Sequence, residues 1–177
     1  CTSLKSIFIP DSVTSIDGSV FYGCTSLASI AIPGSVSSIE GYSFYGCTSL
    51  ASVTLHEGLT SIGYNAFYGC TSLASVKLPE GVTFIGDSVF EDCTSLVSVS
   101  IPGSVTSLGY RAFCGCPRLS EVICYASLPP KIMVADGFNE NPSFDGGGTL
   151  YVPSGCADVY KSSDWGKVFD EIVEMER

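Results

Sequence analysis

A cysteine at every 23rd position is the feature that most constrains what this chain can fold into. The intervals contain no insertion or deletion, and the repeated cysteines are Cys1, Cys24, Cys47, Cys70, Cys93 and Cys116. Each block reads approximately C-T-S-L-x-S-I-x-I-P-x-x-V-x-S-I-x-G-x-x-F-Y-G. Five blocks are full, and a sixth begins as CPRLSEVIC before the pattern ends. A fixed period of this kind predicts a repeat architecture in which each block is one structural unit.

Apolar residues recur at fixed places inside each block, which indicates the side that faces the core. In the first block they are Leu4, Ile7, Ile9, Val13, Ile16 and Phe21, and the later blocks keep this register. The segment LKSIFI has the L-x-x-L-x-L form of a leucine-rich-repeat strand, and VTSI predicts a second short extended piece. The departures are His56 for the proline, Asp92 for the glycine before cysteine and Glu91 for a tyrosine. None of these should disrupt a coil.

Proline and glycine mark the corners of the predicted coil. The prolines cannot donate to a strand ladder, so they should end the first strand; they are Pro10, Pro33, Pro79 and Pro102. A glycine follows the second extended piece in every full block, at Gly18, Gly41, Gly63, Gly86 and Gly109. We expect these glycines to adopt positive φ.

Stacking such blocks predicts a leucine-rich-repeat solenoid of 23-residue coils with short parallel β-strands, mixed but strand-rich, and with a small α/β C-terminal cap. Five full coils at the strand spacing of about 4.8 Å would make a rod on the order of 24 Å long. We place the repeats at residues 1–124 and a capping segment, packed on the last repeat, at residues 125–177. Because the chain opens at Cys1 in the middle of the pattern, we expect a mature product or a fragment of a longer protein.

The C-terminal segment is a different module. LYVP predicts one more buried strand ending at Pro153, and Ser154 is positioned to supply the N-cap of a short helix. Trp165, Phe169 and Ile172 offer large apolar groups that could cover the last coil. Between these segments, Asp136, Asn139, Asn141 and Asp145 could offer oxygens to calcium, but their spacing does not match an EF-hand and a plain surface loop is the preferred interpretation.

The blocks from Cys1 to about Cys124 resemble the BspA-type (Treponema-type) leucine-rich repeat of bacterial cell-surface proteins, which also occurs in some surface proteins of parasitic protists. The tail resembles the ending of such proteins in gut Bacteroidetes. Its matching residues are Pro129, Pro130, Leu150, Tyr151, Val152, Pro153, Tyr160, Trp165 and Phe169. The resemblance implies a secreted or cell-surface adhesion protein, and it supplies no catalytic or cofactor residues.

Composition and chemistry narrow the possible functions further. The net charge of −10 disfavours nucleic acid and anionic membranes, and no apolar run is long enough for a membrane helix. His56 is the only histidine and no G-x-S-x-G motif is present, so we expect no enzyme, no metal and no cofactor. The repeated cysteines should be reduced core thiols, because a line of sulfurs cannot converge on a metal. For the remaining cysteines the sequence leaves two alternatives. Cys124 could be a buried core residue, or a disulfide could form between two of Cys114, Cys124 and Cys156.

Two outward files of side chains are candidate contact surfaces for a host protein, a matrix protein or a glycan. Tyr22, Tyr45 and Tyr68 form an aromatic file that could bind a partner or merely shield the neighbouring phenylalanines. On the strand face, Phe8, Thr54 and Lys77 belong to a small and nearly uncharged surface. The favoured function is an extracellular binding or adhesion module, and the alternative is a passive spacer on the cell surface.

Overall fold

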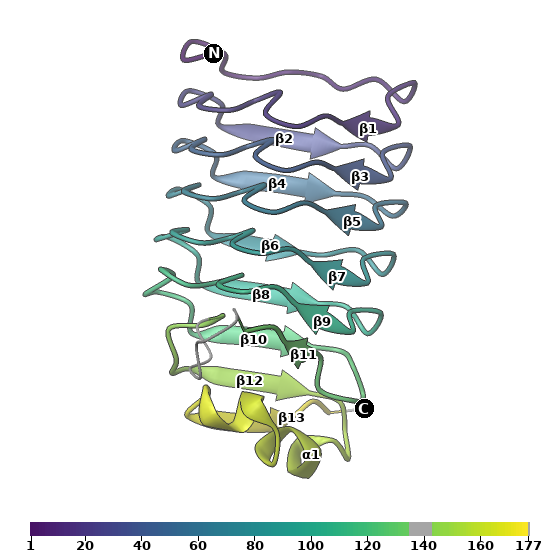
Figure 1. Cartoon of the computed structure of the whole chain (residues 1–177), viewed down its shortest axis with the longest axis vertical. Helices are drawn as coiled ribbons and strands as arrows, with labels where there is room; N and C mark the ends of the chain where they lie inside the picture. Colours follow the sequence, from purple (N-terminus) through teal and green to yellow (C-terminus); the bar gives the residue numbers. More distant parts are fainter. Residues whose placement is uncertain (135–142, 177) are drawn as a thin grey trace.

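The computed structural model describes residues 1–134 and 143–176. It shows a stack of coils that runs from the N-terminus, at the top of Figure 1, to a small helical cap at the bottom. The second strands of the coils form one parallel sheet in chain order. They are β1 (Ser15–Ile16), β3 (Ser38–Ile39), β5 (Ser61–Ile62), β7 (Phe84–Ile85), β9 (Ser107–Leu108) and β11 (Lys131–Ile132). Between consecutive full coils the register is the sequence period itself, since Ser38 pairs with Ser61 and Ile39 with Ile62. The predicted solenoid is therefore confirmed.

The first strands of the coils form two further parallel sheets. β2 (Ser29–Ile32) pairs with β4 (Ser52–Leu55). The longer sheet has the order β13 (Glu171–Glu174), β12 (Thr149–Val152), β10 (Glu121–Cys124), β8 (Ser98–Ile101) and β6 (Ser75–Lys77). Within the described residues no ladder joins β4 to β6, and the inward residues Val53 and Leu55 are only half-buried. The first-strand side of the solenoid is thus divided where the second-strand side is continuous.

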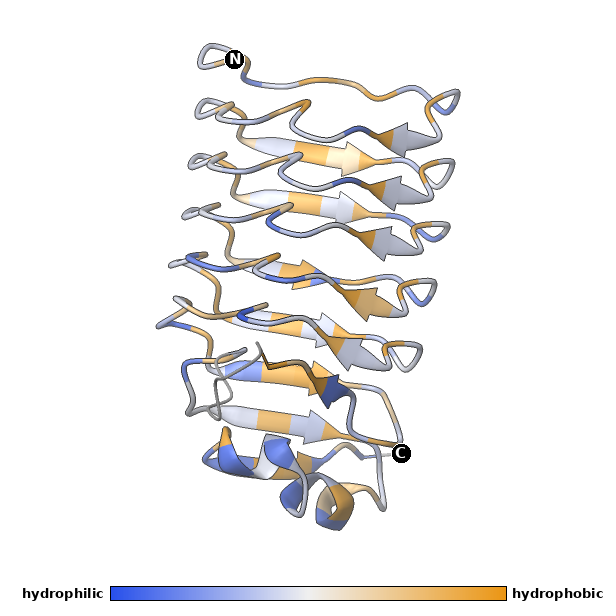
Figure 2. Cartoon of the chain, viewed as in Figure 1, coloured by the Kyte–Doolittle hydropathy of each residue, from blue (hydrophilic) through white to orange (hydrophobic). Residues whose placement is uncertain are grey.

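Apolar side chains fill the space between the two sides of the coil. In Figure 2 the hydrophobic residues, coloured orange, recur at the same place in successive strands. The predicted inward sets of the second and fifth blocks are all buried, from Leu27 to Phe44 and from Leu96 to Phe113. The core phenylalanines stack ring on ring along the axis, from Phe21 through Phe44, Phe67, Phe90 and Phe113 to Phe144, at 5.0–5.4 Å between centroids. Burial of each coil thus depends on the coils beside it.

The strand predicted over residues 4–9 is wrong. This segment joins the second coil through one backbone hydrogen bond, from the Ala28 amide to the Lys5 carbonyl. Ile7, predicted to face inward, is 40% exposed. The first coil packs on one side only among the described residues, so neither its ladder nor its core is complete.

The predicted positive φ at the glycine corner is also wrong. The left-handed residues there are the ones that follow in the chain, such as Tyr42 and Asn65, and their amides donate to the next coil. The glycines serve close approach instead. A Cβ on Gly63 would lie 2.6 Å from the Gly41 nitrogen, and one on Gly86 would lie 2.9 Å from the Ile62 oxygen. Absence of a side chain, not backbone freedom, is what these positions require.

The C-terminal segment closes the stack with α1 (Ala157–Lys161), the short 3-10 helix η1 (Asp164–Lys167) and β13. Tyr160 and Trp165 are fully buried, and each donates a hydrogen bond of 2.8 Å, to the carbonyls of Ala126 and Pro130 respectively. β12 coincides with the predicted LYVP strand. β11 also lies beyond Cys124, so the second-strand sheet extends into the segment interpreted as the cap.

The predicted cap of the helix at Ser154 is wrong. The N-cap residue is Cys156, which makes no side-chain cap hydrogen bond. The chain first makes a turn from Pro153 to Cys156, and the amide of Ala157 then donates to the Glu174 carboxylate at 3.0 Å. Hydrogen bonds from this helix end lower the pKa of Glu174. Glu174 of β13 therefore accepts the hydrogen bond at the helix N-terminus that was predicted for Ser154.

Candidate interaction surface

The repeated cysteines belong to the core and not to a reactive site. Cys24, Cys47, Cys70, Cys93 and Cys116 are buried free thiols, whereas Cys1 is exposed. From Cys47 onward each thiol lies 3.1–3.3 Å from the carbonyl oxygen of the phenylalanine 26 residues earlier. Burial raises the pKa of Cys47 to about 11 and that of Cys116 to about 12. Such thiols are protonated at neutral pH and are poor nucleophiles.

Cys124 lies outside the cysteine file and is buried as a core residue, with its sulfur 3.2 Å from the Tyr160 hydroxyl oxygen. Cys114 and Cys156 are half-buried free thiols. In the described residues no group of three histidine, cysteine or acidic side chains is arranged to hold a metal ion. His56 is an exposed residue just after β4, as expected.

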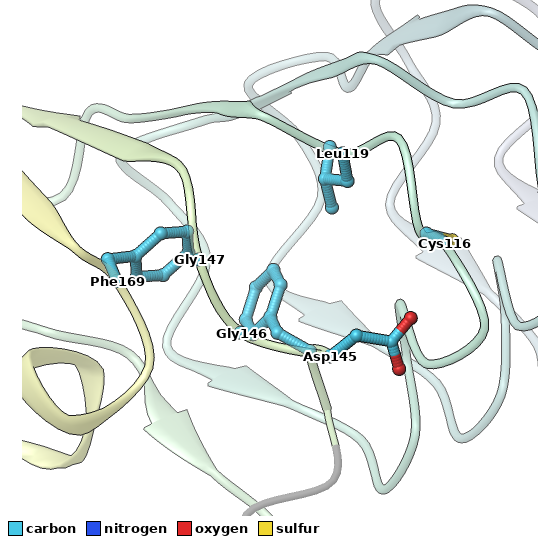
Figure 3. Close-up of a pocket in the computed structure, with 7 residues that line it drawn as sticks. Cys116, Leu119, Asp145, Gly146, Gly147 and Phe169 are labelled. Atoms are coloured by element: carbon cyan, nitrogen blue, oxygen red, sulfur yellow. The ribbon is translucent and has the colours of Figure 1, made fainter.

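The residues considered for calcium divide between two parts of the chain. Asp136, Asn139 and Asn141 lie outside the described residues. Asp145 accepts a hydrogen bond of 3.0 Å from the Gly115 amide, and it lines a small pocket with Cys116, Leu119 and Phe169 at the junction of the last coil and the cap (Figure 3). Its carboxylate thus joins the two modules.

The predicted tyrosine file has a regular geometry. Tyr22, Tyr45 and Tyr68 follow the second strand of three successive coils, and their rings stack at 5.0 and 4.7 Å between centroids with interplanar angles of 2° and 4°. Backbone hydrogen bonds of 2.8 Å from Gly23 to Tyr45 and from Gly46 to Tyr68 hold the loops in step. Tyr22 is 52% exposed, and the other two rings are half-buried.

Two further tyrosines extend this aromatic surface and were not foreseen from the repeat. Tyr42 lies 5.6 Å from Tyr45, and Tyr64 meets Tyr42 edge-on at 5.1 Å. The ring of Tyr64 lies against Gly41, where a Cβ would come within 2.9 Å of it. Both residues vary from block to block, and their proximity depends on that glycine. A scan for aromatic residues outside the repeated positions could have found them.

Charged residues end the tyrosine file at the fourth coil. The Tyr68 hydroxyl donates to Asp92 Oδ2 at 2.7 Å, and this bond raises the pKa of Tyr68 to about 12. The next position holds Glu91, which is 6% exposed and accepts two hydrogen bonds from Arg111. The file therefore has a defined end, at which the last ring is fixed by a carboxylate.

The strand-face candidates lie where the repeat predicts, with Phe8 84% exposed and Thr54 and Lys77 exposed. They come from the first-strand side of the coil, whereas the tyrosines come from the loop after the second strand. Thr54 and Lys77 line a groove over the division between β4 and β6, together with Ser52, His56 and Glu57. No contact joins Phe8 to them among the described residues, so the three do not form one site.

Among the described residues, no helix has the length and apolar character needed to cross a membrane.

A family model described as BspA type leucine-rich repeat region matches residues 1–120 in six copies. No curated protein shows significant similarity to the chain.

Solved structures that resemble the chain include three bacterial proteins. A leucine-rich repeat protein from Bacteroides ovatus is 38% identical over 68% of this chain, with a TM-score of 0.57. The T. pallidum leucine-rich repeat protein is 30% identical over 91% of it, with a TM-score of 0.63. The chain spans 37% and 63% of those two proteins, less than two thirds of either. The pneumococcal vaccine antigen PcpA, 20% identical over 88% of this chain and 43% of its own length, shares the fold at a TM-score of 0.65. None of these matches indicates an enzymatic family.

Proposed function

This chain belongs to the BspA-type leucine-rich repeat family, and on that premise we propose that it is a cell-surface module that binds a protein or a glycan. The observation that carries the proposal is the tyrosine file. Three coplanar rings are presented at a fixed spacing on coils whose backbones are hydrogen-bonded to one another. Rigid aromatic side chains of this kind bring large contact area with little loss of conformational entropy on binding.

The exposure of Tyr22 favours binding over simple shielding of the core. The phenylalanines behind the file are already buried by their own stacking, with Phe44 and Phe67 fully inaccessible. A tyrosine that is 52% exposed adds little to that burial. Tyr22 stacks on Tyr45, and about half of its surface is open to a partner, as is common for tyrosines at interface centres.

No catalytic role is proposed. The single histidine is an exposed turn residue, and the buried thiols have raised pKa values. No nucleophile, base and orienting group therefore converge in the described part of the chain. The alternative function is a passive spacer. The unbroken second-strand sheet and the continuous phenylalanine stack favour it, because both would make a stiff rod.

An array of glycans and of host and matrix proteins, probed with the purified chain, tests the proposal. The triple variant Tyr22→Ala, Tyr45→Ala, Tyr68→Ala should weaken the best interaction at least tenfold, because truncating a tyrosine at an interface centre costs about 2 kcal/mol or more. Tyr125→Ala is the control, since Tyr125 is 47% exposed but lies outside the file. Equal binding by the triple variant would remove the tyrosine file as the contact surface. A chain that binds nothing on the arrays would favour the spacer.

A further inference from the structure

The second-strand sheet carries two residues that break its own pattern, and one of them is apolar. The outward position of this sheet is serine at Ser15, Ser38, Ser61 and Ser107, but it is Phe84 in β7 and Lys131 in β11. Phe84 pairs in register with Ser61 on one side and Ser107 on the other, and it is 43% exposed. A lone exposed phenylalanine needs no explanation. The surroundings of Phe84, however, are those of a site.

A groove of about 330 Å³ lies beside Phe84, and we call it the Phe84 groove. The residues that line it include Phe84, Tyr64, Ser61, Glu40 and Asp87, together with Gly63 and Gly86. The hollow follows from the fold, because the close approach of the coils leaves no room for a Cβ at either glycine. Its volume lies at the lower end of the range of about 300–1,000 Å³ found for ligand pockets.

The charge of the groove has one sign. Glu40 and Asp87 are exposed carboxylates, and no basic residue lines the groove. One oxygen of Asp87 accepts the Tyr110 amide at 2.8 Å, and no partner for its other oxygen is found in the described ranges. Residues 1–110 contain eight acidic residues and only two basic ones, Lys5 and Lys77, both in first-strand segments. The lining of the groove is therefore negative, and the nearest basic residues are Arg111, which pairs with Glu91, and Lys131 in β11, two strands beyond Phe84.

We propose that the Phe84 groove binds the side chain of a lysine or arginine from a basic segment of a partner protein. Two aromatic rings, 54% and 43% exposed for Tyr64 and Phe84, offer faces that attract a cation. Glu40 and Asp87 add two carboxylates to the same lining, each of which can accept a charge-assisted hydrogen bond, and Ser61 offers a hydroxyl. An anionic partner is disfavoured by the carboxylates, and a neutral sugar would leave their charge uncompensated.

The Phe84 groove lies beside the tyrosine file, but binding at the two surfaces can be measured separately. Tyr64 contacts the file only through Tyr42, whereas Phe84, Glu40 and Asp87 have no ring contact or ion pair with the file in the part of the chain that the structure describes. A partner held by stacking on the file does not require a cation. Loss of binding at one surface can therefore be measured without loss at the other.

The experiment uses a short glycine-spaced peptide with two arginines, and a matched peptide with citrulline in their place, titrated into the whole chain and followed by NMR and calorimetry. The arginine peptide should shift the amide signals of Ser61, Tyr64, Phe84 and Asp87. Phe84→Ser restores the residue that the repeat itself uses, so the variant should fold, and it should weaken binding about fivefold to tenfold. Glu40→Gln should weaken it less, and added salt should weaken it further.

Glu80→Gln is the matched control, because Glu80 is an exposed acidic residue outside the groove. It should leave the affinity for the arginine peptide unchanged. Equal binding of the citrulline peptide, equal loss in Glu80→Gln and Glu40→Gln, or unchanged affinity in a folded Phe84→Ser variant would each overturn the proposal. Neutral glycans that shift the same signals while the arginine peptide does not would overturn it as well. If the triple tyrosine variant bound its partner as well as the wild type, only the proposed function would be contradicted, and the proposal for the Phe84 groove would stand.

Discussion

Ionisation of the buried cysteines gives a quantitative test of the core. Cys47 is fully buried, and burial raises its pKa to about 11 from the ordinary value of 9.0. The folded chain therefore keeps a proton that the unfolded chain releases above pH 9. Stability is unaffected below pH 8 and falls as the pH rises from about 9 through 11, because the unfolded state binds fewer protons in this window.

The size of the effect follows from the same two values. A pKa difference of about two units corresponds to about 2.7 kcal/mol at most, and linkage gives a loss of about 1.3 kcal/mol from Cys47 between pH 8 and pH 10. Burial raises the pKa of Cys70 and Cys93 as well, so the whole cysteine file acts in the same direction. Against a typical folding free energy of about 5–15 kcal/mol, a marked alkaline destabilisation is expected.

Urea unfolding in the presence of a reductant, at pH 8 and at pH 10, measures this loss. Cys47→Ala should be less stable than the wild type at pH 8, because it removes buried atoms, but its further loss up to pH 10 should be smaller by about 1.3 kcal/mol. The two proteins share all their other ionisable groups, so the difference isolates the Cys47 thiol. Cys1→Ala is the control, since Cys1 is exposed. Identical pH dependence of Cys47→Ala and the wild type would refute the reasoning.

Three further substitutions test other contacts by thermal or urea unfolding. Gly109→Ala should destabilise by about 1–3 kcal/mol, because its Cβ would lie 2.5 Å from the Asp87 nitrogen; an unchanged midpoint would contradict the role of close approach. Arg111→Ala should cost about 1–3 kcal/mol by leaving the buried Glu91 carboxylate without its partner, and the double variant with Glu91→Gln should recover part of it. Trp165→Ala should cost about 3–5 kcal/mol, whereas a cap that contributes little would leave stability unchanged.

The period was sufficient to predict the fold. Each coil must bury the same face on its neighbours, so the register, the inward residues and the cysteine file follow from a repeat of 23. Predictions failed where the repetition is incomplete. Among the described residues the first coil packs on one coil only, and residues 4–9 form no strand there. β13 lies in a tail with no period to place it.

The prediction of positive φ at the glycine corner failed for a different reason. A conserved spacing indicates that a side chain is not tolerated, but it cannot distinguish positive φ from close approach. At Gly63 the closeness arises from the Gly41 backbone of the preceding coil. A contact of this kind exists only after the coils stack, so it cannot be predicted from the sequence of a single block. The same holds for Tyr64, whose position on Gly41 joins two coils.

Departures from the repeat are therefore the informative positions on the surface of this chain. Stacking dictates the repeated inward residues, and replacing one of them would affect every function equally through stability. Stacking does not dictate an outward residue, so Phe84 has no role in the core. Its neighbours in the sheet, Ser61 and Ser107, show that the fold accepts serine at this position. Glu91 and Asp92 fix the end of the tyrosine file, while Phe84, Tyr64 and Asp87 shape the groove beside it. In a solenoid of near-identical coils, these few residues are what can make one part of the surface different from another.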